Sequence, residues 1–122
     1  MISAISDIPH HVVAFKATGE ITLDEYQNTI VPAIKKLAEL TNEINFILYL
    51  DTDSDNFTKT AWYKDALLNL KSLGRWNRSA IITDSSNIIS FTKAFSYLVP
   101  GEFKGFTIEN YEEAVLWVSS AT

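Results

Sequence analysis

Acidic side chains follow two of the strands that the sequence predicts. Asp51, Asp53 and Asp55 come directly after an apolar run. Asp84 comes directly after the next predicted strand. Ligands of parallel α/β sheets usually bind at the carboxyl ends of the strands, so these carboxylates are where metal binding or phosphoryl transfer would be expected.

The first acidic group has part of the spacing of a calcium-binding loop. Asp51, Asp53 and Asp55 occupy positions 1, 3 and 5 of an EF-hand loop. Position 6 of such a loop requires Gly and position 12 a bidentate Glu, whereas this chain has Asn56 and Trp62 there. Because the main calcium ligand is missing, we expect no metal site.

The same strand end has part of a phosphotransferase motif. A hydrophobic strand that ends in Asp-x-Asp resembles the first motif of the haloacid dehalogenase family. This resemblance implies a metal-dependent phosphatase with Asp51 as nucleophile and Asp53 as acid/base, and Thr83 would stand in the second motif. However, Asp55 stands where that family has Thr or Val, and no later pair of aspartates follows. We favour acids that satisfy helix amides at a strand-to-helix turn, with the phosphatase as the alternative.

Other catalytic or cofactor-binding patterns are missing from the sequence. His10 and His11 are adjacent, so in a strand they point to opposite faces and cannot grip one metal ion together. The four glycines are dispersed, no G-x-S-x-G elbow occurs, and there is no cysteine. We therefore expect a protein that is not an enzyme and that binds no cofactor and no metal.

The segment 88–106 is richer in apolar residues than one packing face needs. Four of them form one stripe of a predicted helix, and a tyrosine lies off that stripe. The excess is covered by the following loop, by an apolar ligand or by a second copy of the chain, and we predict a homodimer. The candidate ligand or dimer surface consists of Ile88, Phe91, Phe95, Tyr97, Leu98 and Phe103.

Strands and helices alternate along the chain in the order ββαβαβαβα. This order predicts an α/β fold: a mostly parallel sheet of four to five strands with an N-terminal antiparallel hairpin and four helices, in a single domain over 1–122. Strands are expected over 2–5, 11–16, 44–50, 79–83 and 106–108, and helices over 22–40, 58–73, 87–98 and from 110 onward.

Two helix starts carry capping signals. Thr22 is followed three residues later by Glu25, and Asn110 by Glu113, so each pair predicts a capping box. Pro32 falls inside the first helix and is expected to kink it. The buried stripe of this helix is predicted to consist of Tyr26, Ile30, Ile34, Leu37 and Leu40.

Composition narrows the class of protein further. The 122 residues are 47% hydrophobic and 20% charged, which is typical of a globular domain and excludes disorder. A net charge of −5 without a basic patch argues against nucleic acid as a partner. No apolar run is long enough for a membrane span and no signal peptide is visible, so we expect a cytoplasmic protein without an integral membrane segment.

Three segments and their order resemble the SpoIIAA-like family, which is related to the STAS domains. The segments are Ala61-Trp-Tyr-Lys-Asp65, Ala80-Ile-Ile-Thr-Asp84 and Tyr111-Glu-Glu-Ala-Val-Leu-Trp117, together with Gly19-Glu-Ile-Thr22 before the first helix. The resemblance covers essentially the whole chain. It implies a small regulatory module that binds a protein partner and has no known catalytic activity. The group also resembles lipid-carrying CRAL-TRIO folds, which implies a small apolar ligand.

Anti-sigma antagonists of the related STAS group are phosphorylated on a serine in an Asp-x-Ser-Gly segment. The corresponding hydroxyl residues here are Ser54 and Thr58, without that pattern. Because three aspartates flank these positions, an added phosphate would be repelled. We predict that no phosphorylation at Ser54 or Thr58 controls this protein.

Overall fold

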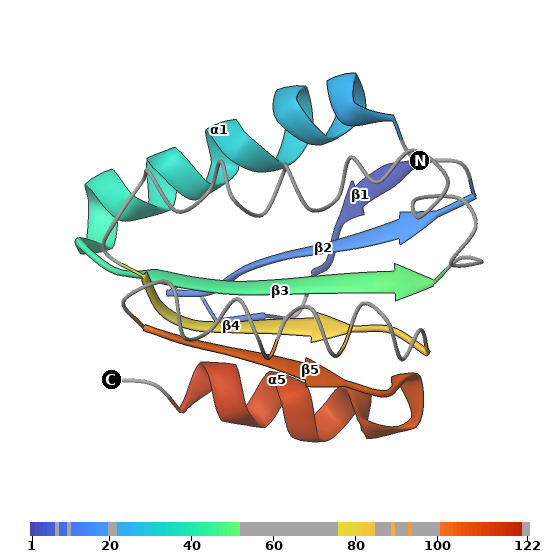
Figure 1. The fold of residues 1–122 in the computed structure, drawn as a ribbon. Helices are drawn as coiled ribbons and strands as arrows, with labels where there is room; N and C mark the ends of the chain where they lie inside the picture. The colour runs from blue at the N-terminus through green and yellow to red at the C-terminus, as the bar shows by residue number, and fades with distance from the viewer. Residues whose placement is uncertain are drawn as a thin grey trace.

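The described part of the chain forms a mixed five-stranded sheet with one α-helix on each face. Its elements are β1 (Ile2–Ala4), β2 (Val13–Thr18), α1 (Leu23–Thr41), β3 (Ile44–Asp51), β4 (Trp76–Ile82), β5 (Glu102–Phe106), the 3-10 helix η1 (Ile108–Asn110) and α5 (Tyr111–Ser119). In this computed structural model the strands lie in the order β1-β2-β3-β4-β5. β1 is antiparallel to β2, and the other neighbouring strands are parallel. Figure 1 shows α1 and α5 on opposite sides of the sheet.

The structure describes residues 1–6, 8–9, 11–19, 22–51, 76–84, 89, 93 and 101–120. Within them, the α/β class, the mixed sheet and the N-terminal hairpin confirm the prediction. The predicted helices over 58–73 and 87–98 lie outside the described residues, apart from Ile89 and Lys93, which are helical. Among the helices that are described, none is both long and apolar enough to cross a membrane.

Helix α1 begins where its capping signal predicts. The hydroxyl of Thr22 accepts a hydrogen bond from the Glu25 amide at 3.1 Å. The Glu25 carboxylate does not complete the box; it accepts a 2.8 Å hydrogen bond from the amide of Ile2 in β1 instead. The same carboxylate lies 3.5 Å from the N-terminal ammonium of Met1. The first turn of α1 is thereby fastened to the edge of the sheet.

The buried stripe of α1 is confirmed at its first four positions and wrong at its last. Leu40 is 74% exposed, and Ala38 is buried in its place. Ala38 follows Ile34 by four residues and stays on the inner face, whereas Leu40 lies well round the helix. The helix continues through Pro32, whose side chain is exposed, and ends where Asn42 adopts a left-handed conformation.

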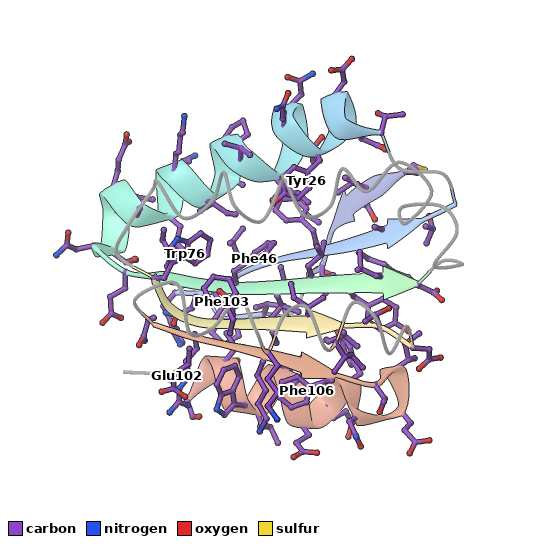
Figure 2. The ribbon with its side chains drawn as sticks, viewed as in Figure 1. Tyr26, Phe46, Trp76, Glu102, Phe103 and Phe106 are labelled. Atoms are coloured by element: carbon purple, nitrogen blue, oxygen red, sulfur yellow. The ribbon has the colours of Figure 1, made fainter. Side chains whose placement is uncertain are left out.

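Each face of the sheet carries its own apolar cluster. Under α1, Phe46 and Trp76 meet edge to face with their ring centres 6.4 Å apart, and Phe103 lies 5.1 Å from Trp76 (Figure 2). The cluster under α5 is smaller and is built from Val12, Ala14, Ile47, Ala80, Ile82, Phe106, Ala114 and Val118. Within the described residues, the α-helix on this second face is α5, which lies against β3 and β4.

Strand β4 starts three residues before its predicted start and contains a bulge. Ile44 pairs with Trp76 but Asn45 pairs with Arg78, so Asn77 is an extra residue in β4. The bulge turns Trp76 and Arg78 to opposite faces: Trp76 is buried in the cluster under α1, and Arg78 reaches α5. Polar Asn77 and Arg78 concealed this part of the strand in the sequence.

Strand β5 ends where the predicted strand at 106–108 begins, so that prediction was wrong. Gly105 explains the error, because a glycine inside a strand weakens its sequence signal. The structure requires glycine there: a Cβ at position 105 would lie 2.9 Å from Cγ2 of Ile89. Ile89 therefore packs directly on the backbone of β5.

The last helix begins at Tyr111, but the predicted capping box at Asn110 and Glu113 is not formed. The side chain of Asn110 makes no capping bond to α5. Its amide group donates instead to the hydroxyl of Thr107 at 3.1 Å. The prediction failed because Asn110 is the last residue of the 3-10 helix η1, which runs directly into α5.

Candidate functional site

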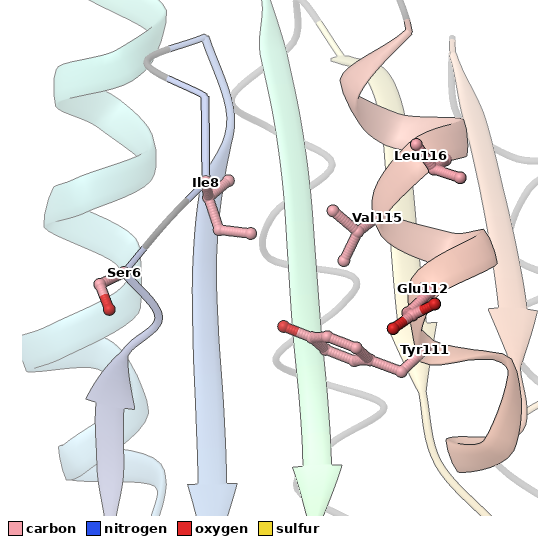
Figure 3. Close-up of a pocket in the computed structure, with 6 residues that line it drawn as sticks. All are labelled: Ser6, Ile8, Tyr111, Glu112, Val115 and Leu116. Carbon is pink, nitrogen blue, oxygen red and sulfur yellow. The ribbon is translucent and has the colours of Figure 1, made fainter.

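An open pocket lies on the α5 face of the sheet, between α5 and the turn that follows β1. Its volume is about 460 Å³. Figure 3 shows Ser6 and Ile8 on one side and the side chains of α5 on the other. Residues from the two ends of the chain thus form the two walls. The lining consists of Ser6, Ile8, Tyr111, Glu112, Val115 and Leu116.

A second hollow of about 320 Å³ lies beside the first and is lined by Ile5, Lys16, Tyr49 and Tyr111. Tyr111 belongs to both. It is the first residue of α5, and its side chain extends from the helix across β3 (Figure 3). There it meets Tyr49 edge to face, with the ring centres 5.2 Å apart. We call the two hollows together the tyrosine groove.

The polar end of the tyrosine groove lies at the carboxyl ends of β2 and β3. The ammonium of Lys16 is 3.5 Å from a carboxylate oxygen of Asp51 and 5.5 Å from the centre of the Tyr49 ring. Burial raises the pKa of the Tyr49 phenol, and the carboxylates of Asp51 and Asp84 raise it further, against the opposing effect of Lys16. This phenol is therefore protonated at neutral pH and is available as a hydrogen-bond donor.

The wall formed by α5 is held at both ends by side chains that lie in or next to the strands. Ahead of the helix, a carboxylate oxygen of Asp84 accepts a 3.2 Å hydrogen bond from the amide of Ile108. At its C-terminal end, Nε2 of His11 donates to the carbonyl of Ser119 at 2.8 Å. The guanidinium of Arg78 donates to the carbonyl of Trp117, also at 2.8 Å. The last two contacts place donors on carbonyls that a helix leaves unpaired at its end.

A buried amide connects these anchors to the middle of the sheet. Asn45 is 1% exposed, and its side-chain amide donates to the carbonyl of His11 at 3.1 Å. Its carbonyl oxygen accepts from the side chain of the bulged residue Asn77, also at 3.1 Å. His11 was expected to be the first residue of a strand over 11–16. It lies just before β2 instead and is half-buried between Asn45 and α5.

The acidic residues singled out in the sequence are only partly described. Asp84 accepts a 3.2 Å hydrogen bond from the amide of Ile108, the first residue of η1, which is 24 residues further along the chain. Asp51 ends β3, pairs with Lys16 and has a 48% exposed side chain. Asp53, Asp55, Ser54 and Thr58 lie outside the described residues. In the described part of the chain, no group of three or more His, Cys, Asp or Glu residues could hold a metal ion.

The predicted apolar surface also lies mostly outside the described residues. Phe103 is described, and it is a buried core ring packed against Trp76, so it presents no surface to a partner. The proposed dimer through this segment stays a prediction. The other five members, which the structure does not describe, are Ile88, Phe91, Phe95, Tyr97 and Leu98.

Sequence reasoning did not predict the apolar part of the tyrosine groove. Its residues come from the turn after β1, from β2 and β3, and from α5, and no local pattern relates segments so far apart. The available signal was Tyr49, an aromatic with a polar end in a strand that is otherwise mostly aliphatic. A second signal was Leu116, an apolar residue of α5 that does not pack into the core and is 71% exposed.

Comparisons with known proteins agree on one family. Residues 12–119 match the SpoIIAA-like family. A similar solved structure is that of an uncharacterised protein with a SpoIIAA-like fold from Shewanella loihica. It is 28% identical in sequence, with a TM-score of 0.60, over 96% of this chain and 93% of that one. A search of curated proteins finds no match.

Proposed function

Because the chain belongs to the SpoIIAA-like family, whose fold it shares, we propose that it is a non-enzymatic binding module and that the tyrosine groove takes the apolar part of a small ligand. The observation that carries this proposal is the groove itself. It is concave, its lining is mainly apolar, and a few polar groups gather at one end. Pockets that bind small molecules have this composition.

The shape of the groove favours a small ligand over a flat protein surface. Its larger hollow has a volume within the range of small-molecule sites, about 300–1,000 Å³. Ile8 and Val115 form apolar walls, and Leu116 stands exposed at the rim. A chain of about eight methylene groups would cover these side chains and gain about 0.8 kcal/mol for each buried group. The expected likeness to lipid-carrying CRAL-TRIO folds and a protein partner stay predictions.

The test is a titration with 1-octanol, followed by NMR chemical shifts of the backbone amides. We expect saturable shifts at α5 and at the turn after β1, and weaker binding in Leu116→Glu, by about fivefold or more. Leu40→Glu is the matched control, since Leu40 is 74% exposed on α1, on the other side of the sheet. Absence of saturable binding, or equal losses in the two variants, would refute the proposal.

The rival function is a magnesium-dependent phosphatase that uses Asp51 and Asp53. It is tested by hydrolysis of p-nitrophenyl phosphate with magnesium present. Asp51 is ion-paired with Lys16 at the polar end of the tyrosine groove, so we expect no turnover above background. Turnover that is lost in Asp51→Asn would establish the phosphatase and overturn the non-enzymatic proposal.

A further inference from the structure

The polar end of the tyrosine groove carries an excess of negative charge. Glu112 lines the larger hollow and Lys16 the smaller one. Asp51 lies against Lys16, and Asp84 is close enough to act on the Tyr49 phenol. Among the described residues at this end, three carboxylates and one ammonium leave two net negative charges around a site that also presents two aromatic rings. This combination attracts a cation and repels an anion.

The protein already shows how a primary ammonium is held at this end. The ammonium of Lys16 lies 5.5 Å from the centre of the Tyr49 ring and 3.5 Å from Asp51. These are the two contacts that stabilise a cation at an aromatic and acidic site. Tyr111 offers a second ring, which borders both hollows, and Glu112 follows it in the first turn of α5. Lys16 therefore already occupies the contacts with Tyr49 and Asp51, whereas Tyr111 and Glu112 both line the larger hollow.

We propose that the tyrosine groove binds an amphiphile whose polar end is a protonated amine, held between the ring of Tyr111 and the carboxylate of Glu112. This rests on the proposed function, because the apolar chain of the same molecule occupies the hollow beside Val115 and Leu116. A carboxylate or phosphate head is disfavoured at this place. The ammonium that the described part of the groove offers, that of Lys16, is already paired with Asp51, and Glu112 and Asp84 would repel an anion.

The experiment compares three ligands with the same chain and different heads: octylammonium, 1-octanol and octanoate. Two net negative charges at about 6 Å in a water-like dielectric predict that octylammonium binds about tenfold more tightly than 1-octanol, and octanoate more weakly still. The preference is expected to shrink as salt is added. If octanoate or 1-octanol binds as well as octylammonium, the inference is overturned and the proposed function stands. If none of the three binds, both fall.

Charge-neutral variants locate the amine. Glu112→Gln is expected to weaken octylammonium about threefold and to leave 1-octanol unchanged. Glu113→Gln is the matched control, because Glu113 is exposed in the same turn of α5 and does not line the groove. Tyr111→Leu keeps an apolar wall and removes the ring, so it should reduce the preference for octylammonium over 1-octanol. Equal effects of the two glutamate variants, or an unchanged preference in Tyr111→Leu, would overturn this placement of the amine.

Discussion

Removing the polar side chains of two buried residues in the sheet should change the stability of the protein in opposite directions. Asn45 and Ser79 are 1% and 0% exposed and lie on neighbouring strands. Both polar atoms of the Asn45 side chain are hydrogen-bonded. Its nitrogen donates to the carbonyl of His11, and its oxygen accepts from the side chain of Asn77. The hydroxyl of Ser79 is buried with no hydrogen-bond partner. We therefore expect Asn45→Ala to destabilise the protein and Ser79→Ala to stabilise it.

The hydrogen bonds set the size of the two effects. Asn45→Ala removes two hydrogen bonds at about 1 kcal/mol each. It also leaves the carbonyl of His11 without a donor, which adds about 1 kcal/mol, so the free energy of unfolding should fall by about 3 kcal/mol. Ser79→Ala removes a buried hydroxyl that has lost its water without gaining a partner, which should raise the free energy of unfolding by about 1 kcal/mol. For a chain of this size, each kcal/mol corresponds to about 4 °C in melting temperature.

Urea unfolding followed by tryptophan fluorescence measures both changes, with an unchanged slope as the sign that only stability differs. Asn77→Ala is a useful third variant. It should cost about 1 kcal/mol alone and add little to Asn45→Ala, because the two changes remove the same bond. The reasoning is refuted if Asn45→Ala costs no more than Ser79→Ala, or if the Asn45 and Asn77 changes are additive.

Two further predictions concern a glycine and the phenols. Gly101 has a φ of +97°, and a Cβ there would lie 2.5 Å from the carbonyl oxygen of Trp76. Gly101→Ala should therefore cost about 3 kcal/mol in urea unfolding, and a loss below about 1 kcal/mol would contradict this. Burial raises the pKa of both Tyr26 and Tyr49 above the ordinary value near 10. Because the folded chain keeps protons that the unfolded chain loses, stability is fully present below about pH 10 and falls as the pH rises further. Phenolate absorbance and urea unfolding follow this loss, which Tyr26→Phe should reduce; an unchanged loss in that variant would contradict the assignment.

The fold was predictable because its main signals are local. Thr22 starts α1, Asn42 follows its end, and the run from Ile44 to Leu50 forms the central strand. The errors occur where a contact with a residue distant in the sequence determines the local structure. Asn45 lies inside the apolar run and is paired by residues distant in the sequence, and Gly105 is required by Ile89. The preferences of a short segment for helix or strand do not reveal contacts with residues distant in the sequence.

The candidate site was less predictable than the fold. Two of the acidic residues singled out at strand ends, Asp51 and Asp84, lie near the polar end of the tyrosine groove. Its apolar part depends on where α5 lies. That position is set by long-range hydrogen bonds to His11, Arg78 and Asp84, which a sequence pattern does not reveal.

The strand order has a consequence for the synthesis of the protein. Each strand lies beside the strand that precedes it in the chain, so every new strand leaving the ribosome can add to an edge that is already formed. The groove does not form in this gradual way. The hydrogen bond that holds the C-terminal end of α5 joins His11 to Ser119, which are 108 residues apart in the chain. A growing chain therefore acquires its sheet progressively and its groove only once α5 has been made, so ligand binding would distinguish chains that include α5 from shorter ones.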